Sequence, residues 1–213
     1  MNQYESIRFI EDPKRAAVWR QIAQYLAPWI DNTRPTVELA AGYCDLSNAL
    51  QSPRRVAIDI SEALPRWAAS GVEAIVGDAT DLSMFANESV GTVLASNFLE
   101  HLEHDQIDRL LAECRRVLGS GGRLILIQPN FALAPRQYFD DYTHRTIFTA
   151  TSLQDRLRSV GFSIVRAEPR FLPLSMKSRL SFGYKLVGPY LKLPYRPLAG
   201  QMMIVAEGGA AAD

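Results

Sequence analysis

Short apolar runs alternate with amphipathic stretches along most of the chain. The clearest run, residues 123–128, is rich in leucine and isoleucine and ends at Pro129. Strands that alternate with helices usually join as parallel neighbours with helices on both faces of the sheet. The pattern therefore predicts an α/β fold, with strands over residues 36–41, 55–60, 73–76, 92–96, 123–128, 162–167 and 202–206.

The best-defined helix is predicted from apolar residues that recur at helical spacing. These residues are Ile107, Leu110, Leu111, Cys114, Val117 and Leu118. The stripe should end at Gly119, and Cys114 is interpreted as a small buried hydrophobe and not as a reactive thiol.

Two further helices can be placed. Thr151 followed by Gln154 indicates a capping box that opens a helix ending near Gly161. An N-terminal helix is predicted over residues 12–31, with its apolar face formed by Val18, Ile22, Tyr25, Leu26 and Trp29.

Composition is that of an ordinary globular protein. The 213 residues are 47% hydrophobic, and the 23 basic and 23 acidic residues balance. This balance argues against a generally basic nucleic-acid binder. Two cysteines make neither a disulfide framework nor a metal cluster, and no signal peptide or membrane-spanning run is recognised. We expect a single domain over residues 1–213 in the cytoplasm.

One segment differs in charge from the rest. Residues 170–206 contain six basic residues and no acidic one. The six are Arg170, Lys177, Arg179, Lys185, Lys192 and Arg196. Three interpretations stay open: a solvated face, a lid over an acceptor at about residues 170–199, or a peripheral contact with an anionic inner membrane.

Polar or flexible residues follow the first four predicted strands. Gly42, Asp59, Asp78 and Asn97 each stand at or just after a strand end. In open parallel sheets, ligands bind beyond the carboxyl ends of the strands. A carboxylate at the second position can accept hydrogen bonds from ribose hydroxyls, and one at the third can accept from the amine of a purine.

These residues resemble the motifs of class I S-adenosylmethionine (SAM)-dependent methyltransferases. The family pattern acid-x-Gly-x-Gly-x-Gly is matched with two glycines replaced, and Gly91 stands where an acid usually opens the fourth strand. The run at residues 97–102, Asn-Phe-Leu-Glu-His-Leu, also fits. The resemblance implies a Rossmann-like, seven-stranded, mostly parallel sheet whose last strand is antiparallel. It implies that SAM, with S-adenosylhomocysteine as product, binds at Glu38, Ala40, Gly42, Tyr43, Cys44, Asp59, Ile60, Asp78, Ala79, Asn97 and Phe98.

A second resemblance concerns the acceptor. Residues 138–149, followed by residues 170–173 and 177–180, are similar to a branch of bacterial methyltransferases associated with polysaccharide or cell-surface glycan biosynthesis. This implies transfer of a methyl group to a hydroxyl of a sugar or glycan acceptor. The alternatives are another small-molecule or lipid-like acceptor, or a non-catalytic partner subunit with this fold.

A sugar hydroxyl profits from a positioned base. His101 and His144 are the candidates, with Asp141 orienting an imidazole or coordinating a metal, whereas His104 is interpreted as a solvated residue at a helix start. Adjacent acids in a loop are usually solvated, so we predict no metal site. Arg145 is interpreted either as a binder of an anionic acceptor group or as the partner of Asp140 or Asp141.

Two other classes of enzyme fit the sequence less well. An NAD-type oxidoreductase would need Gly-x-Gly-x-x-Gly, but no glycine follows Gly42 before Gly71. A nucleic-acid methyltransferase is disfavoured by the zero net charge and by the lack of an Asn-Pro-Pro-Tyr-type motif after the fourth strand.

Overall fold

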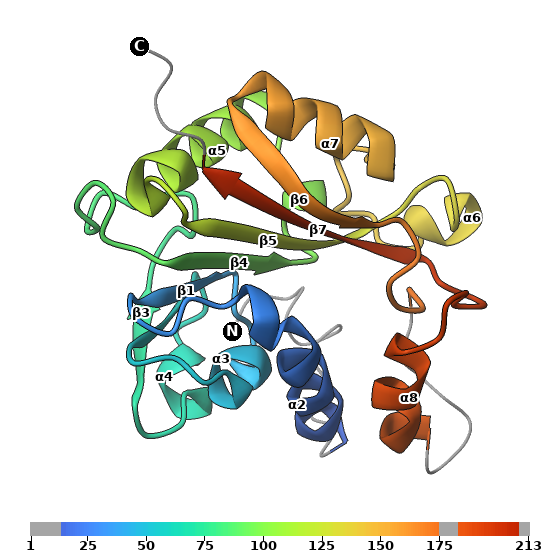
Figure 1. Ribbon diagram of the computed structural model, residues 1–213, viewed down its shortest axis with the longest axis horizontal. Coiled ribbons are helices and arrows are strands. Elements are labelled where there is room, and N and C mark those ends of the chain that lie inside the picture. The colour runs from blue at the N-terminus through green and yellow to red at the C-terminus, as the bar shows by residue number, and fades with distance from the viewer. Residues whose placement is uncertain (1–13, 175–182, 209–213) are drawn as a thin grey trace.

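The computed structural model describes residues 14–174 and 183–208, and within them seven strands form one sheet. The strands are β1 (Thr36–Leu39), β2 (Arg55–Asp59), β3 (Val72–Val76), β4 (Thr92–Ser96), β5 (Arg123–Pro129), β6 (Phe162–Glu168) and β7 (Gln201–Gly208). Their order is β3-β2-β1-β4-β5-β7-β6, and β7 runs antiparallel to both of its neighbours, β5 and β6, whereas all other pairs are parallel (Figure 1). The predicted fold is confirmed, including the antiparallel last strand.

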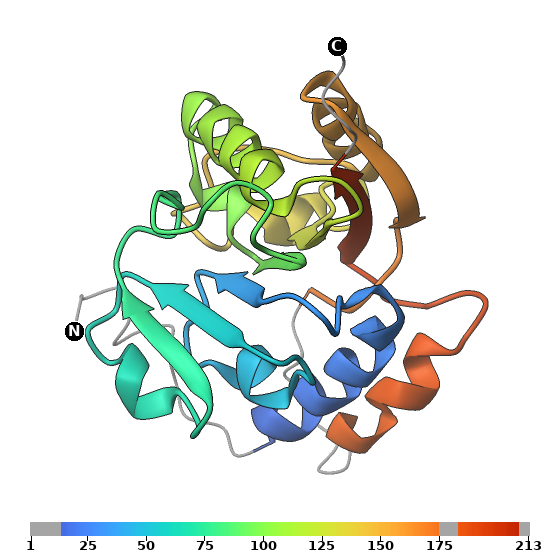
Figure 2. The ribbon, with the colours of Figure 1, turned by 60° about the vertical axis from the view of Figure 1, so that its left-hand side comes forward.

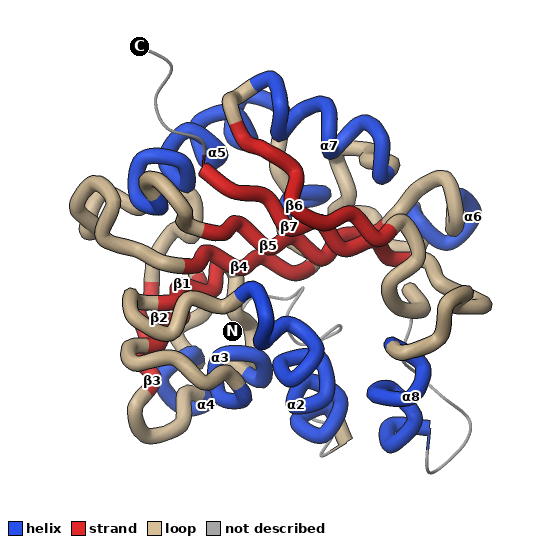
Figure 3. The backbone as a smooth tube through the Cα atoms, viewed as in Figure 1, coloured by secondary structure: helices blue, strands red, loops and turns tan. Residues whose placement is uncertain are grey.

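Helices cover both faces of the sheet (Figure 3). The longer ones are α2 (Arg15–Leu26), α5 (His104–Leu118) and α7 (Ala150–Ser159), and the shorter ones are α3 (Asp45–Ala49), α4 (Leu64–Trp67), α6 (Pro135–Tyr138) and α8 (Val187–Leu191). The described part of the chain also contains the 3₁₀ turns Ala27–Trp29, Leu99–His101 and Gly183–Leu186. α5 and α7 pack on one face, while α2, α3 and α8 pack on the other. Figure 2 shows α2 and α8 side by side.

The helix caps differ from the sequence prediction at one point. Helix α7 is capped by Thr149, whose Oγ1 accepts from the backbone N–H of Ser152 at 3.1 Å. The predicted cap at Thr151 is wrong because Thr151 already lies inside the helix. His104 begins α5 and is exposed, as expected. The N-terminal helix begins at Arg15, and residues 12 and 13 of its predicted range lie outside the described residues.

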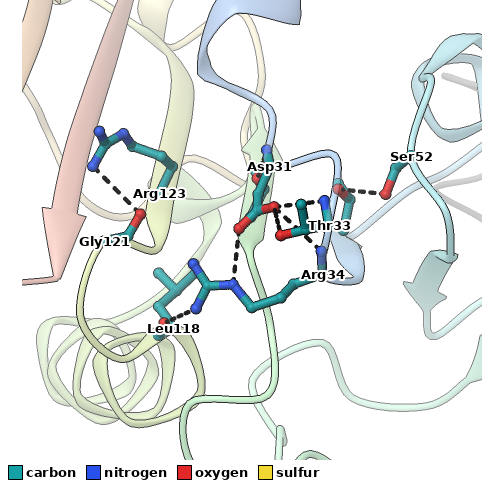
Figure 4. A network of polar contacts seen from close by, with 9 residues as sticks. Asp31, Thr33, Arg34, Ser52, Leu118, Gly121 and Arg123 are labelled. Carbon is teal, nitrogen blue, oxygen red and sulfur yellow. Dashed lines mark hydrogen bonds and ion pairs between the residues drawn. The ribbon is translucent and has the colours of Figure 1, made fainter.

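Gly91 has a steric reason for replacing the usual acid. A Cβ at Gly91 would lie 2.6 Å from the Cβ of Asp31. The Asp31 carboxylate accepts from Thr33 N at 2.7 Å and from Arg34 Nε at 2.8 Å, which closes the turn before β1 (Figure 4). Partial burial raises the pKa of Asp31, but these hydrogen bonds outweigh it and hold that pKa well below its usual range.

The basic segment is joined to the body of the molecule by a buried ion pair. Arg196 is buried and pairs with buried Glu168, and its Nη2 donates to the Tyr25 hydroxyl at 2.9 Å. Tyr25 Oη in turn donates to Glu168 at 2.6 Å. Arg196, one of the six basic residues of the segment, is therefore buried in an ion pair and is not part of a solvated face. Lys177 and Arg179 lie outside the described residues.

Candidate functional site

One large cavity opens at the carboxyl ends of the parallel strands. Its volume is about 1120 Å³. The strand side is formed by Glu38, Ala40, Ala41, Gly42, Asp59, Ile60, Ser96, Asn97 and Phe98. The opposite side comes from α2, from the loop around α6, and from the two chain segments that flank residues 175–197. Ligand pockets commonly measure 300–1,000 Å³, so this cavity has room for two ligands.

The loop after β1 has an unusual backbone at every second residue. Ala40, Gly42 and Cys44 have φ of 51°, 53° and 55°, in the left-handed region. These are the three positions where the resembled pattern carries glycine, and for alanine or cysteine this conformation costs about 1–2 kcal/mol. The turn therefore keeps its glycine-type shape without two of its glycines.

Cys44 is accommodated because its side chain points into the core. It is fully buried against Ala41, Ala57 and Leu64, and burial raises the pKa of its thiol to about 12. It does not border the cavity. A thiol in this setting is a packing group and not a nucleophile.

Asp59 is fixed on the cavity wall. Its Oδ2 accepts from Gly42 N at 2.7 Å, and its Oδ1 accepts from Ser61 N at 2.9 Å. An ionised carboxylate has about four acceptor positions, so each oxygen can still accept from a ligand hydroxyl. The neighbouring Ile60 is 77% exposed and forms part of the same wall.

Glu38 lies deeper in the same wall. Its carboxylate accepts from Ser47 N at 2.8 Å and from the Ser47 hydroxyl, which ties β1 to α3. Burial raises the pKa of Glu38 to about 7, against the lowering effect of the Ser47 hydrogen bonds.

Two of the predicted catalytic residues, His101 and His144, lie side by side on the cavity wall. The ring centroids of His101 and His144 are 5.0 Å apart, and His144 Nε2 lies 4.0 Å from Glu100 Oε1. Glu100 is 1% exposed, and neither carboxylate oxygen accepts a hydrogen bond from the described residues. Burial, together with the charge of Asp141, raises the pKa of Glu100 to about 8. Glu100 was present in the resembled run but was not predicted as a site residue.

A threonine that was not predicted connects Asp141 to His101. The Thr143 hydroxyl donates to Asp141 Oδ1 at 2.6 Å and lies 2.9 Å from His101 Nδ1. Since its one proton goes to the carboxylate, the hydroxyl oxygen accepts from Nδ1–H of the imidazole. This arrangement places the lone pair of a neutral His101 on Nε2. Burial is the main reason why the pKa of His101 is lowered, and His144 adds to it.

The loop that carries His144 is held by its own backbone. Arg145 N and Thr146 N donate to the Glu100 carbonyl at 2.7 and 3.1 Å, and the buried Tyr138 hydroxyl donates to Thr146 O at 2.6 Å. The Arg145 guanidinium pairs with Glu103 at 2.7 Å. The interpretation of Arg145 as the partner of Asp140 or Asp141 is replaced by a pairing with Glu103, and its alternative role as a binder of an anionic acceptor group stays a prediction.

Comparison with known proteins finds a similar family of domains. The family described as "Methyltransferase domain" matches residues 37–126, which hold all the predicted cofactor residues. This part of the chain is therefore similar to methyltransferase domains, and the seven-stranded sheet is that of the Rossmann-like methyltransferase fold. The match supports the predictions of a SAM-dependent methyltransferase and of SAM as its cofactor. The glycan branch is not tested by the match and stays a prediction.

The proteins that resemble this chain are named for different reactions. A malonyl-[acyl-carrier protein] O-methyltransferase of Methylococcus capsulatus (strain Bath) is 30% identical over 74% of the chain, which spans 63% of that relative. A SAM-dependent methyltransferase of Archaeoglobus fulgidus has a TM-score of 0.67 at 18% identity, with 97% of this chain and all of that chain covered. The [4+2]-cyclase SpnF has a TM-score of 0.62 at 17% identity, with coverage of 90% and 82%. At these identities the two structures show the fold alone.

The described residues suit SAM in most of the predicted positions. Seven of the predicted cofactor residues border the cavity: Glu38, Ala40, Gly42, Asp59, Ile60, Asn97 and Phe98. Their donor set combines carboxylate acceptors, an open backbone loop and apolar side chains, which fits a cofactor with hydroxyls, an amine and a flat base. Asn97 has φ of 49° and its Oδ1 accepts from Gln201 Nε2 at 2.7 Å.

The other four predicted cofactor residues do not border the cavity. Asp78 is exposed and accepts from Thr80 N at 2.8 Å, and Ala79 is buried in the core. The Tyr43 ring packs edge-on against Trp67, with a centroid distance of 4.8 Å, and Cys44 points inward. Direct contact of these four with the cofactor stays a prediction.

Proposed function

We propose that this methyltransferase transfers the methyl group of SAM to an oxygen of a hydroxyl-bearing acceptor, in first place a sugar or glycan. The observation that carries the proposal is the Glu100–His101–His144 cluster, which borders the same cavity as Asp59 and Gly42. A hydroxyl is a weak nucleophile while it keeps its proton, and such a cluster can hold or remove that proton.

SAM supplies an activated methyl group when it is bound. The chain's own residues do the remaining work. Asp59 and the loop at Gly42 fix the cofactor side, and the cluster orients the acceptor oxygen. Aligning two reactants in this way can lower a barrier by several kcal/mol. His101 faces the acceptor with Nε2 while Asp141 acts on it through Thr143, which is the orienting role predicted for Asp141.

The acceptor half of the cavity is polar. Gln137, Asp140, Asp141 and Arg170 line it, which suits a ligand with several hydroxyls. Arg170, Leu198 and Gly200 border the cavity from the C-terminal segment. This supports the interpretation of that segment as an acceptor lid.

A second acceptor class is favoured by the Methylococcus relative, whose name identifies a malonyl carboxyl. A carboxylate oxygen is already ionised at neutral pH and gains nothing from a base. The buried cluster therefore favours a hydroxyl over a carboxylate.

The first test is calorimetric titration with SAM and S-adenosylhomocysteine. The wild type should bind both, and Asp59→Ala should weaken SAM binding at least tenfold because charge-assisted hydrogen bonds contribute about 1.5–3 kcal/mol. Asp105→Ala, at an exposed carboxylate of α5, is the matched control and should bind like the wild type. Folded wild-type protein that binds neither compound would refute the proposal.

The second test is transfer from methyl-labelled SAM to a panel of sugars, glycans and malonyl thioesters. Label in a sugar hydroxyl would support the first acceptor class, and label only in the thioester would support the second. SAM binding without transfer to any acceptor would favour the non-catalytic partner subunit.

Contact with an anionic membrane is a separate and weaker part of the proposal. Exposed Lys185 and Lys192 support it, whereas Arg196 is occupied inside the molecule. Among the described helices none is both long and apolar enough to cross a bilayer. Co-sedimentation with anionic vesicles tests the contact, and equal recovery with neutral vesicles would refute it. Cytoplasmic location and the absence of a nucleic-acid partner likewise remain predictions.

A further inference from the structure

We infer that Glu100, His101 and His144 form a binding site for a divalent transition-metal cation, with the acceptor oxygen as a further ligand. The inference rests on the proposed function only for the acceptor. The sequence analysis predicted no metal site, because it considered Asp140 and Asp141 together with His144 and not buried Glu100.

The ligand atoms of these three residues converge. One carboxylate oxygen and one nitrogen from each imidazole lie within 4.8 Å of one another. The 4.0 Å between Glu100 Oε1 and His144 Nε2 is too long for a hydrogen bond. Ligands of a tetrahedral cation at about 2.1 Å are separated by about 3.4 Å, so a small inward movement would complete the set.

Glu100 supplies an independent reason to expect a cation. Its carboxylate is almost completely buried on the cavity wall, and neither oxygen has a hydrogen-bond partner among residues 14–174 and 183–208. Burying a carboxylate without a partner is costly, and buried charges are normally paired or coordinated to a metal. A cation between Glu100 and the two imidazoles would satisfy it.

The contacts of His101 match those of a metal ligand. Ligating histidines usually donate their other ring N–H to an oxygen, which fixes the tautomer and the ring orientation. His101 Nδ1 meets the Thr143 hydroxyl at 2.9 Å, and that hydroxyl donates to Asp141. This leaves Nε2 as the ligand atom and makes Thr143 and Asp141 positioning residues. With a cation bound, the cation activates the acceptor hydroxyl in place of the His101 lone pair.

The donor set also limits the kind of cation. Two imidazoles with one carboxylate suit zinc, manganese, iron or cobalt, whereas magnesium and calcium prefer all-oxygen sites. Three protein ligands leave a coordination position open, and the cluster borders the cavity. An acceptor hydroxyl bound there would lose its proton to water more readily, because the cation stabilises the oxyanion.

The test measures metal binding directly, after dialysis of the full chain against a chelator. Calorimetric titration with Zn²⁺ and Mn²⁺, with Mn²⁺ also followed by electron paramagnetic resonance, should give one site per chain. Glu100→Gln and His144→Asn should each weaken binding at least tenfold. His104→Asn, which changes the chain's third and exposed histidine, is the matched control and should bind as the wild type does.

A third variant covers the case in which the cluster variants do not fold. Thr143→Val keeps the three ligands but removes the hydrogen bond to His101, and it should weaken binding about tenfold or more. Circular dichroism and SAM binding establish that each variant is folded. Stoichiometric metal binding that is unchanged in Glu100→Gln, His144→Asn and Thr143→Val would overturn the inference. Binding lost in His104→Asn, or absent from the wild type, would do the same.

The outcomes separate this inference from the proposed function. Methyl transfer that proceeds undiminished in excess chelator would overturn the metal site and leave the methyltransferase proposal intact. Metal bound at the cluster without transfer to any acceptor would retain the site and count against the proposed function.

Discussion

Replacing Glu38 by glutamine should change how the stability of this protein depends on pH. Glu38 is buried, and its pKa in the folded protein is about 7, compared with an ordinary value of 4.5. Burial of the carboxylate is the main cause, and the nearby carboxylates of Asp45 and Asp59 add to it.

The sign and the size follow from linkage. Between pH 4.5 and about pH 7 the folded protein holds a proton on Glu38 that the unfolded chain has released. Unfolding free energy therefore falls as the pH rises through this window. The difference between the two pKa values corresponds to about 3 kcal/mol, fully present below pH 4.5 and lost by about pH 8.

A glutamine side chain at this position cannot ionise, but its carbonyl can still accept from Ser47 N. Glu38→Gln should therefore match the wild type near pH 4 and exceed its unfolding free energy by about 3 kcal/mol near pH 8. Urea denaturation of both proteins from pH 4 to pH 8 measures this. The difference between the two curves isolates Glu38, because buried Glu100 titrates in both. Curves that stay parallel over the whole range would refute the reasoning.

Two further predictions concern backbone strain and the buried ion pair. Ala40→Gly should raise the unfolding free energy by about 0.5–1 kcal/mol, because glycine relieves the left-handed strain at φ of 51° and its own entropy cost offsets only part of this. Replacing exposed Ala112, inside α5, by glycine should lower the unfolding free energy by about 1 kcal/mol. Equal effects of the two substitutions in thermal melts would contradict the strain argument. Arg196→Ala should lower the unfolding free energy by about 3 kcal/mol, because it leaves buried Glu168 without the guanidinium that it pairs with. The control Lys192→Ala, at an exposed lysine, should change the unfolding free energy by less than about 0.5 kcal/mol. Similar melting temperatures for these two variants would show that Arg196 is not structural.

The elements of the fold could be predicted because they are encoded locally. Apolar alternation placed all seven strands to within a few residues, and the stripe along α5 placed that helix. The cap of α7 was missed because Thr149 and Thr151 both offer a hydroxyl near the helix start. Which one caps depends on where the chain leaves its extended conformation.

The cofactor half of the site could also be predicted from the sequence. The carboxyl ends of parallel strands share one edge of the sheet, so the polar residues after β1, β2 and β4 had to meet there. The sequence did not explain why Ala40 and Cys44 can replace glycines. It depends on the backbone conformation and on a core pocket that receives the Cys44 side chain.

The acceptor half was decided by tertiary structure. In the sequence, Glu100 is one acid in a run of mixed polar and apolar residues. Its burial without a hydrogen-bond partner is visible only in the folded protein, where the loop at Thr143 and His144 covers it. Likewise, Arg196 of the basic segment is not available on the surface, because it pairs with Glu168, 28 residues earlier in the chain. Periodicity and motif spacing fix which face or strand end a residue occupies. Whether a charge is solvated, paired or left for a ligand depends on what the rest of the chain brings against it.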